Sequence, residues 1–325
     1  MAVFTPLSDA QVAAFLEKFD VGSLVSLQGV AGGTENSTFF VTTERREMVL
    51  TLFEQGEHEE LPFFVELLDY LDEHGLPVPG TIHDREGVAL HSLAGKPALL
   101  FPRLPGKHPT APNLAQCQAL GSALGRMHKV SQHFPGHRPN PRNLHWLRAV
   151  HHKVLTYISP DDQTLMKNEV DDFETAFSQY GALPQGALHG DLFRDNTLYE
   201  GDQLGGIIDF YNGCTGDLLF DLAIVINDWA SNEDGSLNAS GKRVVGIGKI
   251  GKREGHFRSP FQGFRNRVLT QPAGREKPSD HGNAKAVASG GTTHQPGRGS
   301  AVPALGCGAF PHPTHGILVA LRVHQ

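Results

Sequence analysis

The densest group of side chains that could do chemistry lies between His189 and Asn196, where the sequence reads H-G-D-L-F-R-D-N. It contains a carboxylate, Asp191, followed five positions later by an amide, Asn196. An apolar segment then ends in a second carboxylate, Asp209. Phosphoryl transfer from ATP requires a carboxylate that orients the attacking hydroxyl and accepts its proton, together with oxygen ligands that hold Mg²⁺ against the phosphates. The pattern predicts that Asp191 is the catalytic carboxylate and that Asn196 and Asp209 bind the metal.

A turn rich in Asx residues between two strands could produce the same letters. At average residue frequencies, however, the eight-residue pattern arises by chance in about 1% of chains of this length. The apolar strand that ends in Asp209 makes a chance match rarer still. We therefore favour the phosphotransfer interpretation over the purely structural one.

A glycine-rich segment near the N-terminus is a second candidate. Gly29, Gly32 and Gly33 lie between two segments rich in β-branched and aromatic residues, Leu24–Gln28 and Thr38–Thr43. The backbone amides of such a loop can cover the phosphates of a nucleotide. A glycine hairpin is the commoner meaning of this pattern by itself, but the position of the segment ahead of the H-G-D motif favours phosphate binding.

The elements that must position these residues fall into two groups. In the first group, a capping-box pattern at Ser8 opens a short amphipathic helix. The signals that follow it are, in chain order, strands at Leu24–Gln28, Thr38–Thr43 and Glu47–Phe53, a helix with apolar residues from Phe64 to Leu71, and strands at Val88–Leu93 and Pro97–Phe101. This β-β-β-α-β-β order predicts a small, mostly antiparallel lobe.

After the segment Phe101–Gly106, which is rich in proline, the pattern becomes helical. Helices are predicted from the cap at Asn113, from Asp161 and over Asp217–Trp229, and Gly206–Phe210 reads as a strand. The predicted fold class is α+β. It comprises an N-terminal β lobe with a helix over residues 1–103, a mainly helical lobe over 104–240 and an irregular tail over 241–325.

The length, charge and cysteine content of the chain argue against several classes of protein. A chain of 325 residues is long enough for two lobes with a sizeable core. The net charge of −7 gives no basic footprint for nucleic acid, and three scattered cysteines argue against a disulfide framework or a cysteine-built zinc site. No apolar stretch approaches the roughly 20 residues that span a bilayer, and the first residues lack the pattern of a signal peptide. We therefore expect a cytoplasmic protein whose partners include neither nucleic acid nor a membrane.

The charge and glycine content of the chain change near Ser240, which the whole-chain averages do not show. Residues 1–240 hold 15 Lys and Arg against 32 Asp and Glu, a balance of −17, whereas residues 241–325 hold 13 against 3, a balance of +10. The last 85 residues also carry 15 of the 37 glycines. Two interpretations compete: a disordered basic tail, or a change of reading frame near codon 240, which we favour because it alters composition abruptly. Irregular structure there would leave apolar residues of the last predicted helix partly uncovered and the protein marginally stable.

Taken together, these motifs resemble the aminoglycoside-phosphotransferase-like branch of the protein-kinase-like fold. Within that branch, the first 240 residues are similar to the family of bacterial homoserine kinases, over the stretches 1–5, 29–37, 48–54, 61–64, 75–79, 189–198 and 208–212. The resemblance covers about three quarters of the chain, and the last 85 residues do not fit it. It implies a two-lobed protein-kinase-like fold.

The resemblance also implies a reaction and its site. ATP and Mg²⁺ would be the cofactors, and L-homoserine would be phosphorylated to O-phospho-L-homoserine, a step of threonine synthesis. Phe101–Leu104 would hold the adenine through backbone contacts. The residues that would cover the phosphates belong to the glycine-rich segment, namely Gly29, Gly32, Gly33, Thr34 and Asn36.

The chain departs from kinase folds in general at the third strand. A lysine usually stands there and holds the α- and β-phosphates, but this sequence has Thr51 at that nucleotide-binding position. The homoserine kinases resemble the chain here too, so Thr51 does not by itself indicate lost function. Metal and backbone amides would then carry more of the nucleotide charge. The resemblance further implies that His189 stabilises the catalytic loop and that Asp221 is a buried structural carboxylate beside it.

Two other functions stay open on the sequence alone. A sibling kinase for choline, an aminoglycoside or another amino alcohol would share the catalytic residues and differ in its acceptor pocket. A kinase-like binding protein without turnover is suggested by Thr51 and by the unusual tail, but Asp191, Asn196 and Asp209 are all present, which argues against a decayed site. The sequence does not identify the residues that hold the acceptor, nor the oligomeric state.

Overall fold

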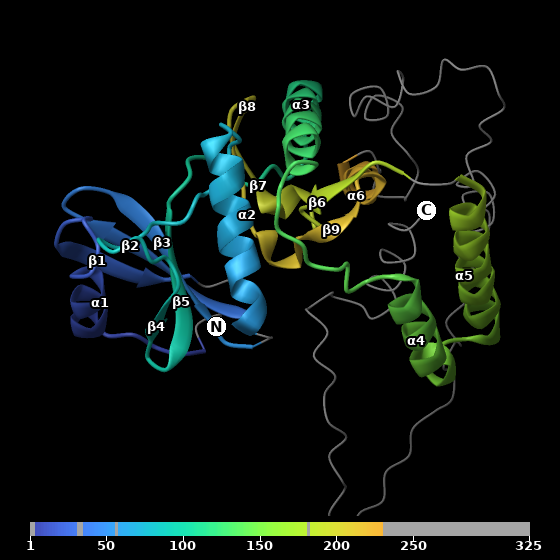
Figure 1. The fold of residues 1–325 in the computed structure, drawn as a ribbon, viewed down its shortest axis with the longest axis horizontal. Helices are drawn as coiled ribbons and strands as arrows, with labels where there is room; N and C mark the ends of the chain where they lie inside the picture. Colours follow the sequence, from blue (N-terminus) through green and yellow to red (C-terminus); the bar gives the residue numbers. More distant parts are fainter. Residues whose placement is uncertain (1–3, 31–34, 56–57, 181–182, 230–325) are drawn as a thin grey trace, which may run out of the picture.

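The N-terminal lobe is built on a five-stranded antiparallel sheet (Figure 1). The structure, a computed structural model, describes residues 4–30, 35–55, 58–180 and 183–229. Across the sheet the strands follow the order β1-β2-β3-β5-β4. Their bounds are β1 (Leu24–Gly29), β2 (Asn36–Thr43), β3 (Glu47–Phe53), β4 (His91–Leu93) and β5 (Lys96–Pro102), with helix α1 (Asp9–Leu16) before them and α2 (Leu61–Glu73) between β3 and β4. The predicted β-β-β-α-β-β order is therefore confirmed.

Alternation along the strands sends successive side chains to opposite faces of this sheet. Met48, Leu50 and Leu52 of β3 pack with α1 in one buried cluster. The residues between them point the other way, and Val49 packs against the cluster that contains α2. Thr51 shares that face with Val49. The sheet therefore presents Thr51 toward the C-terminal lobe.

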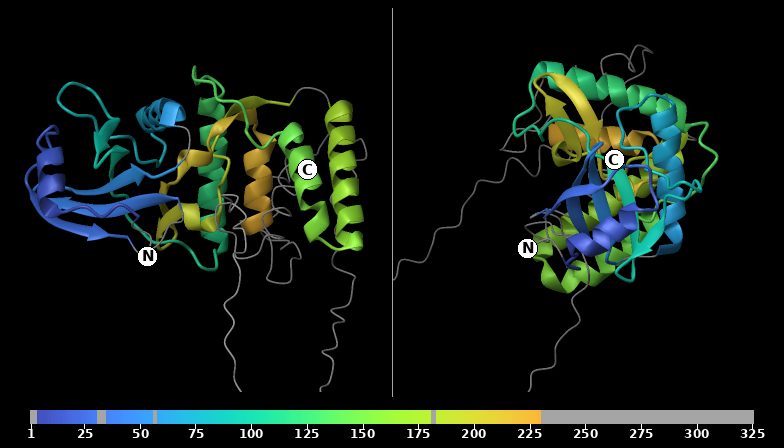
Figure 2. Two further views of the ribbon diagram at one scale, coloured as in Figure 1. Left: turned by 90° about the horizontal axis from the view of Figure 1, so that it is seen from below. Right: turned by 90° about the vertical axis from the view of Figure 1, so that its left-hand side faces the viewer.

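The C-terminal lobe is mainly helical. Its helices are α3 (Leu114–Ser131), α4 (Leu144–Val154), α5 (Pro160–Tyr180) and α6 (Leu219–Trp229). Two small antiparallel sheets accompany them, one pairing β6 (Gln185–Leu188) with β9 (Cys214–Asp217) and one pairing β7 (Thr197–Glu200) with β8 (Gln203–Ile207). Figure 2 shows α4 and α5 at the end of the molecule that is farthest from the N-terminal sheet.

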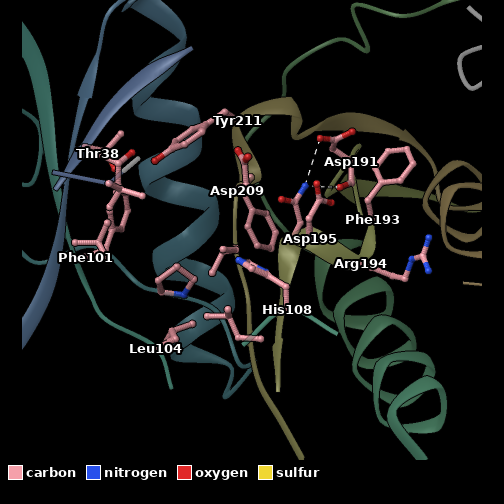
Figure 3. Close-up of a pocket in the computed structure, with 18 of the residues that line it drawn as sticks. Thr38, Phe101, Leu104, His108, Asp191, Phe193, Arg194, Asp195, Asp209 and Tyr211 are labelled. Atoms are coloured by element: carbon pink, nitrogen blue, oxygen red, sulfur yellow. Dashed lines mark hydrogen bonds between the residues drawn. The ribbon is translucent and has the colours of Figure 1, made fainter. Parts of the chain in front are cut away.

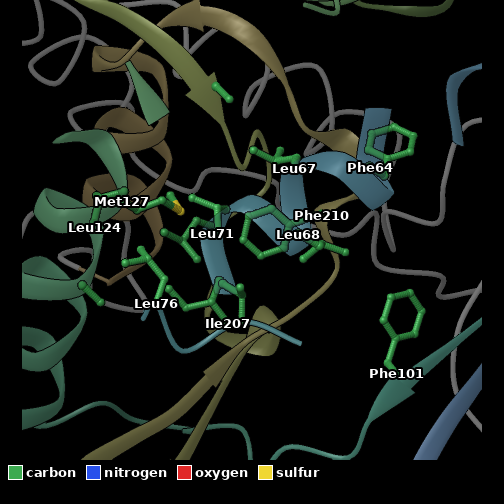
Figure 4. Packing of buried hydrophobic residues seen from close by; sticks show 14 of the residues in the cluster. Phe64, Leu67, Leu68, Leu71, Leu76, Phe101, Leu124, Met127, Ile207 and Phe210 are labelled. Carbon is green, nitrogen blue, oxygen red and sulfur yellow. The ribbon is translucent and has the colours of Figure 1, made fainter. Parts of the chain in front are cut away.

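Helix α2 joins the two lobes through apolar packing (Figure 4). Its buried residues recur at helical spacing, so Phe64, Leu68 and Leu71 lie on one face. They form a single buried cluster with Phe101 of β5 and Met127 of α3. Because one cluster draws on both lobes, the burial of apolar surface sets how the lobes sit against each other.

The connection between the lobes is clamped to the β7–β8 hairpin. Lys107 and Tyr199 exchange two backbone hydrogen bonds, with N···O distances of 3.0 and 2.9 Å. At Gly106 the backbone has a φ of 106°, and a β-carbon there would lie 2.7 Å from backbone atoms of Tyr199. Glycine is needed at this position both for the backbone conformation and for the close approach.

Several element boundaries differ from the sequence-based expectation. The strand predicted over Gly206–Phe210 is wrong at its end, because β8 stops at Ile207 and the chain enters a left-handed conformation at Asp209. The helix predicted to begin at Asp217 begins at Leu219, since Asp217 closes β9. Helix α4 and strand β9 are absent from the prediction, and β9 reads C-T-G-D, in which glycine and aspartate are poor strand formers.

The predicted tail over residues 241–325 and its boundary at 240 lie outside the described residues. The frame-change hypothesis stays a prediction, and the coding DNA around codon 240, read in all three frames, will test it. Helix α6, which precedes that point, buries Ile224, Val225 and Trp229, whereas Leu219 is 46% exposed. Among the helices of the described ranges, none is both long and apolar enough to cross a membrane.

We predict that Gly106→Ala destabilises the protein more than Gly95→Ala does. Both glycines have a positive φ, but a β-carbon at Gly95 meets nothing within 4 Å, whereas one at Gly106 meets the Tyr199 backbone. Both substitutions carry the left-handed penalty of about 1–2 kcal/mol, and only Gly106→Ala adds an overpacking cost of about 1–3 kcal/mol. Urea unfolding of the two variants measures the difference, and equal losses would show that the connection is not clamped.

Candidate active site

A cavity of about 1240 Å³ opens between the two lobes. The N-terminal sheet contributes Thr38 and Phe101 to its wall, the connection contributes Leu104, and the C-terminal lobe contributes Asp191 and Asp209 (Figure 3). Residues that are far apart in the sequence therefore face one space. A pocket of this size accommodates a nucleotide together with a small acceptor.

The loop that carries Asp191 is held by the buried carboxylate of Asp221 in α6. One oxygen of Asp221 accepts the backbone N–H of His189 at 2.9 Å, and the other accepts the backbone N–H of Gly190 at 2.8 Å. His128 of α3 lies 3.3 Å from the same carboxylate through its Nε2. Burial raises the pKa of Asp221, but the hydrogen bonds and nearby histidines more than offset it, so the pKa lies below its ordinary value. The carboxylate predicted from the sequence to be buried and structural therefore has that environment.

His189 ties the same loop to the segment that carries Asp209. Its Nδ1 accepts the backbone N–H of Asp191 at 3.2 Å, and its Nε2 lies 2.9 Å from the carbonyl oxygen of Ile208. This pair of partners requires the tautomer with the proton on Nε2. Burial lowers the pKa of His189, which keeps the ring neutral and suits this structural role. The ring also packs against Phe210, with centroids 4.4 Å apart.

Glycine is required between His189 and Asp191. Gly190 has a φ of 77°, and a β-carbon there would lie 2.4 Å from the carbonyl oxygen of Asn212. No other residue fits both the backbone conformation and the space. The second letter of the H-G-D motif is therefore set by packing rather than by chemistry.

Asn196 is oriented by the residue it is predicted to work with. Its Nδ2 donates to the carbonyl oxygen of Asp191 at 2.7 Å, and lies 3.3 Å from Oδ2 of Asp191. Its backbone carbonyl oxygen accepts the backbone N–H of Ile208 at 2.9 Å. The side-chain nitrogen is thus engaged with Asp191, which leaves the side-chain oxygen as the available ligand atom.

Asp209 reaches the cavity because the chain turns there. Its φ of 66° and ψ of 59° place it in the left-handed region, which is uncommon outside glycine. The side chain faces the open cavity, but the walls around it remove much of its water, and the charges of Asp191, Glu35 and Asp195 add repulsion. These effects, in that order, raise the pKa of Asp209 to about 7. Burial also raises the pKa of Asp191, and the charge of Arg142 and the hydrogen bond from Asn196 oppose the rise.

Thr51, which the resemblance to kinases predicts to stand in place of their lysine, lies beside aromatic residues. Thr51 is buried in β3 and faces Tyr211, whose hydroxyl it hydrogen-bonds. The Tyr211 ring packs edge-to-face against Phe53 of β3, at 4.9 Å, and against Phe64 of α2, at 6.0 Å. An aromatic contact therefore links β3, α2 and the segment after Asp209, where kinases generally use a lysine–glutamate pair.

The other predicted nucleotide-binding residues are placed as follows. Asn36 opens β2 and Phe101 lies near the end of β5, and both line the cavity together with Leu104. Gly29 ends β1, where it pairs with Phe39, and the next residue lines the cavity. Three further predicted residues, Gly32, Gly33 and Thr34, lie outside the described residues. The structure thus brings seven of the predicted binding and catalytic positions from the two lobes to one cavity, namely Asn36, Thr51, Phe101, Leu104, Asp191, Asn196 and Asp209.

Sequence reasoning missed several residues of the cavity wall. Arg142 stands in the long loop before α4, whereas Glu35 and Tyr211 lie inside the recognised stretches 29–37 and 208–212. Arg194 is bound to Asp228 of α6 through its backbone N–H at 2.8 Å and its guanidinium at 3.0 Å. For Arg194 and Glu35, position inside a recognised motif was a usable signal. Arg142 carries no motif, so the tertiary structure alone identifies it.

Comparisons with known proteins assign this chain to a protein family. The sequence model of the phosphotransferase enzyme family, APH, matches residues 26–256. This chain belongs to that family.

Among its relatives, three curated homoserine kinases are similar over most of their length. The one from Pseudomonas aeruginosa is 45% identical over 245 residues, which is 75% of this chain and 78% of the relative. The one from Ralstonia pickettii is 42% identical over 241 residues, covering 70% and 72%. The one from Neisseria meningitidis serogroup B is 40% identical over 255 residues, covering 78% and 82%.

Solved structures of antibiotic kinases share the fold. An amicoumacin kinase in complex with AMP-PNP and Ca²⁺ has a TM-score of 0.58 at 19% identity, covering 74% of this chain and 76% of that one. A spectinomycin phosphotransferase in complex with ADP has a TM-score of 0.57 at 16% identity, covering 74% and 78%. The predicted α+β, two-lobed protein-kinase-like fold is confirmed.

We predict that Asp209→Asn stabilises the metal-free protein at high pH. The pKa of Asp209 in the folded state is about 7, above its ordinary value of 3.8. Because the pKa is higher in the folded state, ionising this carboxyl costs stability. Its stabilising contribution is complete at pH values below the unfolded pKa and is lost as the pH rises through about 7. In EDTA, Asp209→Asn should melt at a higher temperature than the parent at pH 8, and the gap should shrink at pH 5.

A matched control is Asp172→Asn, which removes a charge from an exposed position on α5. It should show no comparable gain at pH 8. If both variants melt like the parent at both pH values, the carboxylates of the cavity do not repel one another as the structure implies.

Proposed function

We propose that this chain transfers the γ-phosphoryl group of ATP to the hydroxyl of L-homoserine, which gives ADP and O-phospho-L-homoserine. The observation that carries the reaction type is the convergence of Asp191, Asn196 and Asp209 on one cavity between the lobes. The choice of acceptor rests on the curated homoserine kinases, which are 40–45% identical over 70–78% of this chain. The use of ATP is supported by the same relatives and by a structural neighbour that holds AMP-PNP.

In this proposal Asp191 accepts the proton of the acceptor hydroxyl as the oxygen attacks. The backbone of the loop is fixed through His189 and Asp221, so the Asp191 carboxylate is aimed before substrates arrive. The raised pKa of Asp191 makes it a better base than an exposed aspartate. Adenine would lie against the connection from Phe101 to Leu104, which lines the opposite side of the cavity.

The residues present fit a divalent cation. Asn196 offers its side-chain oxygen, because its nitrogen is bound to Asp191, and Asp209 offers a carboxylate that is repelled by its neighbours. Oxygen ligands of this kind suit Mg²⁺. When bound, Mg²⁺ would neutralise negative charge on the phosphates. Because Thr51 supplies no cation to the nucleotide, the remaining ligands of the phosphates carry more of that load.

An acceptor panel separates the proposal from its alternatives. The full-length chain is mixed with ATP and Mg²⁺, and ADP release is followed with L-homoserine, choline and kanamycin in parallel, with the product identified by mass spectrometry. We expect turnover with L-homoserine. A preference for choline or kanamycin would assign a sibling kinase, and binding of ATP without phosphorylation of any acceptor would support a binding protein without turnover.

We predict that Asp191→Ala lowers kcat by about 10²–10⁴-fold, because general-base assistance is lost. ATP binding should be nearly intact, since the adenine side of the cavity is unchanged. Steady-state kinetics together with a nucleotide-binding titration measure the two effects. A variant with near-normal kcat would show that the catalytic loop is misassigned.

A second substitution tests the metal assignment. Asp209→Asn should lower kcat and raise the Mg²⁺ concentration needed for half-maximal rate, because the cation loses an anionic ligand. The measurement is a Mg²⁺ titration of the rate at saturating ATP, with Asp172→Asn as the control. An unchanged Mg²⁺ dependence would exclude Asp209 as the ligand.

A further inference from the structure

The proposed function leaves open how the cavity holds an acceptor that carries its own negative charge. L-Homoserine has a carboxylate and an ammonium at the end opposite the hydroxyl. The hydroxyl must reach Asp191, and Asp195 and Asp209 add two more carboxylates to the same wall. A carboxylate brought into this region is repelled unless a cation stands within reach.

Four Arg and Lys residues among the described residues line the cavity, and they come from different parts of the fold. Arg103 lies over the ring of Phe40, at 4.1 Å from the centroid, and Lys107 belongs to the connection between the lobes. Arg194 is bound to Asp228. The fourth is Arg142, in the loop that precedes α4 on the C-terminal side. It lines the cavity from the C-terminal lobe, which also carries Asp191, so this cation stands on the side of the cavity where the acceptor reacts.

The loop that carries Arg142 is rigidly attached to the catalytic lobe. The carbonyl oxygen of Arg138 accepts the backbone N–H of Thr215 in β9 at 2.6 Å, and the Arg138 guanidinium donates to the carbonyl oxygen of Gly213 at 2.8 Å. The backbone N–H of Arg142 itself donates to Oδ1 of Asn140 at 2.8 Å. The half-buried Arg142 is thus held on the catalytic side of the cavity before any substrate binds.

We propose that the Arg142 guanidinium binds the carboxylate of the acceptor while the acceptor hydroxyl meets Asp191. The inference rests on the proposed function, because it takes an amino-acid alcohol as substrate. In extended L-homoserine the hydroxyl oxygen and the carboxylate carbon are about 5 Å apart, from bond lengths of about 1.5 Å. Asp191 and Arg142 both line the C-terminal side of the cavity, so the two ends of one acceptor molecule can face them. Guanidinium is the side chain best shaped for a carboxylate, since it can donate two parallel hydrogen bonds.

The experiment compares two acceptors that differ in one group. L-Homoserine carries the carboxylate, and L-homoserinamide replaces it with a neutral amide while keeping the hydroxyl and the ammonium. In the full-length chain with ATP and Mg²⁺, kcat/KM should favour L-homoserine. Arg142→Gln should lower kcat/KM for L-homoserine by roughly 10–100-fold, the value of a charge-assisted hydrogen bond to a carboxylate, mainly through KM. The value for L-homoserinamide should change little.

Two further variants complete the test. Arg142→Lys keeps the charge and loses the planar pair of donors, so it should give a KM for L-homoserine between those of the parent and Arg142→Gln. It also carries the test if Arg142→Gln does not fold. Arg148→Gln removes an exposed guanidinium of α4 that pairs with Glu174 outside the cavity, and it should leave both acceptors unaffected.

The outcomes are distinguishable. If Arg142→Gln lowers kcat/KM equally for both acceptors, Arg142 acts on Asp191 or on folding, and the inference is overturned while the proposed function stands. If the parent phosphorylates L-homoserine and L-homoserinamide equally well, no cation of the cavity binds the carboxylate of the acceptor, and the inference also fails. If the parent phosphorylates neither acceptor, the proposed function itself is wrong.

Discussion

A carboxylate taken out of water is stable only where hydrogen bonds and opposite charge replace the water, and Asp221 meets that condition through its contacts with the loop that carries Asp191. Its two oxygens accept the backbone N–H groups of His189 and Gly190, and His128 stands beside them. The loop conformation and the buried charge therefore depend on each other. If the loop moved, the charge would lose its partners, and if Asp221 were absent, two buried donors would be left unsatisfied.

Hydrogen bonds of His189 and Asn196 connect this loop to the rest of the C-terminal side of the cavity. His189 accepts a hydrogen bond from the backbone of Asp191 and contacts the carbonyl oxygen of Ile208, so one neutral ring fixes both the loop that carries Asp191 and the segment that leads to Asp209. Asn196 adds a second link between the same two segments. These links hold the carboxylates of the cavity in place in spite of the repulsion between them. The stability that the site loses through this repulsion is offset by apolar packing of α2 and the surrounding elements.

The N-terminal side is positioned against these residues mainly by packing, together with an ion pair between Glu60, just before α2, and Arg138. Phe53, Tyr211 and Phe64 make edge-to-face contacts that connect the sheet, the segment after Asp209 and α2. The connection between the lobes is fixed to the β7–β8 hairpin at Gly106 and Lys107. These aromatic contacts are apolar, so this part of the packing between the lobes depends on shape and apolar area. It should accordingly respond less to salt than an exposed ion pair would.

The sequence by itself determined the elements whose signals are local. Periodicity and capping gave α1, α2 and α3, alternation gave the strands of the N-terminal sheet, and the spacing from His189 to Asn196 was enough to indicate phosphoryl transfer. It also predicted Asp221 as a structural carboxylate. Local patterns could not place the end of β8, because Ile208 and Phe210 continue the apolar pattern of the strand and only the contacts of the folded chain turn Asp209 into the left-handed region. Nor could they indicate β9, which has weak strand formers and exists because β6 pairs with it. Arg142 carries no motif, and it lines the same cavity as Asp191 only because the loop before α4 is bonded to β9. Interactions between residues distant in the chain decided these features, since their free energy comes from partners that no local window contains.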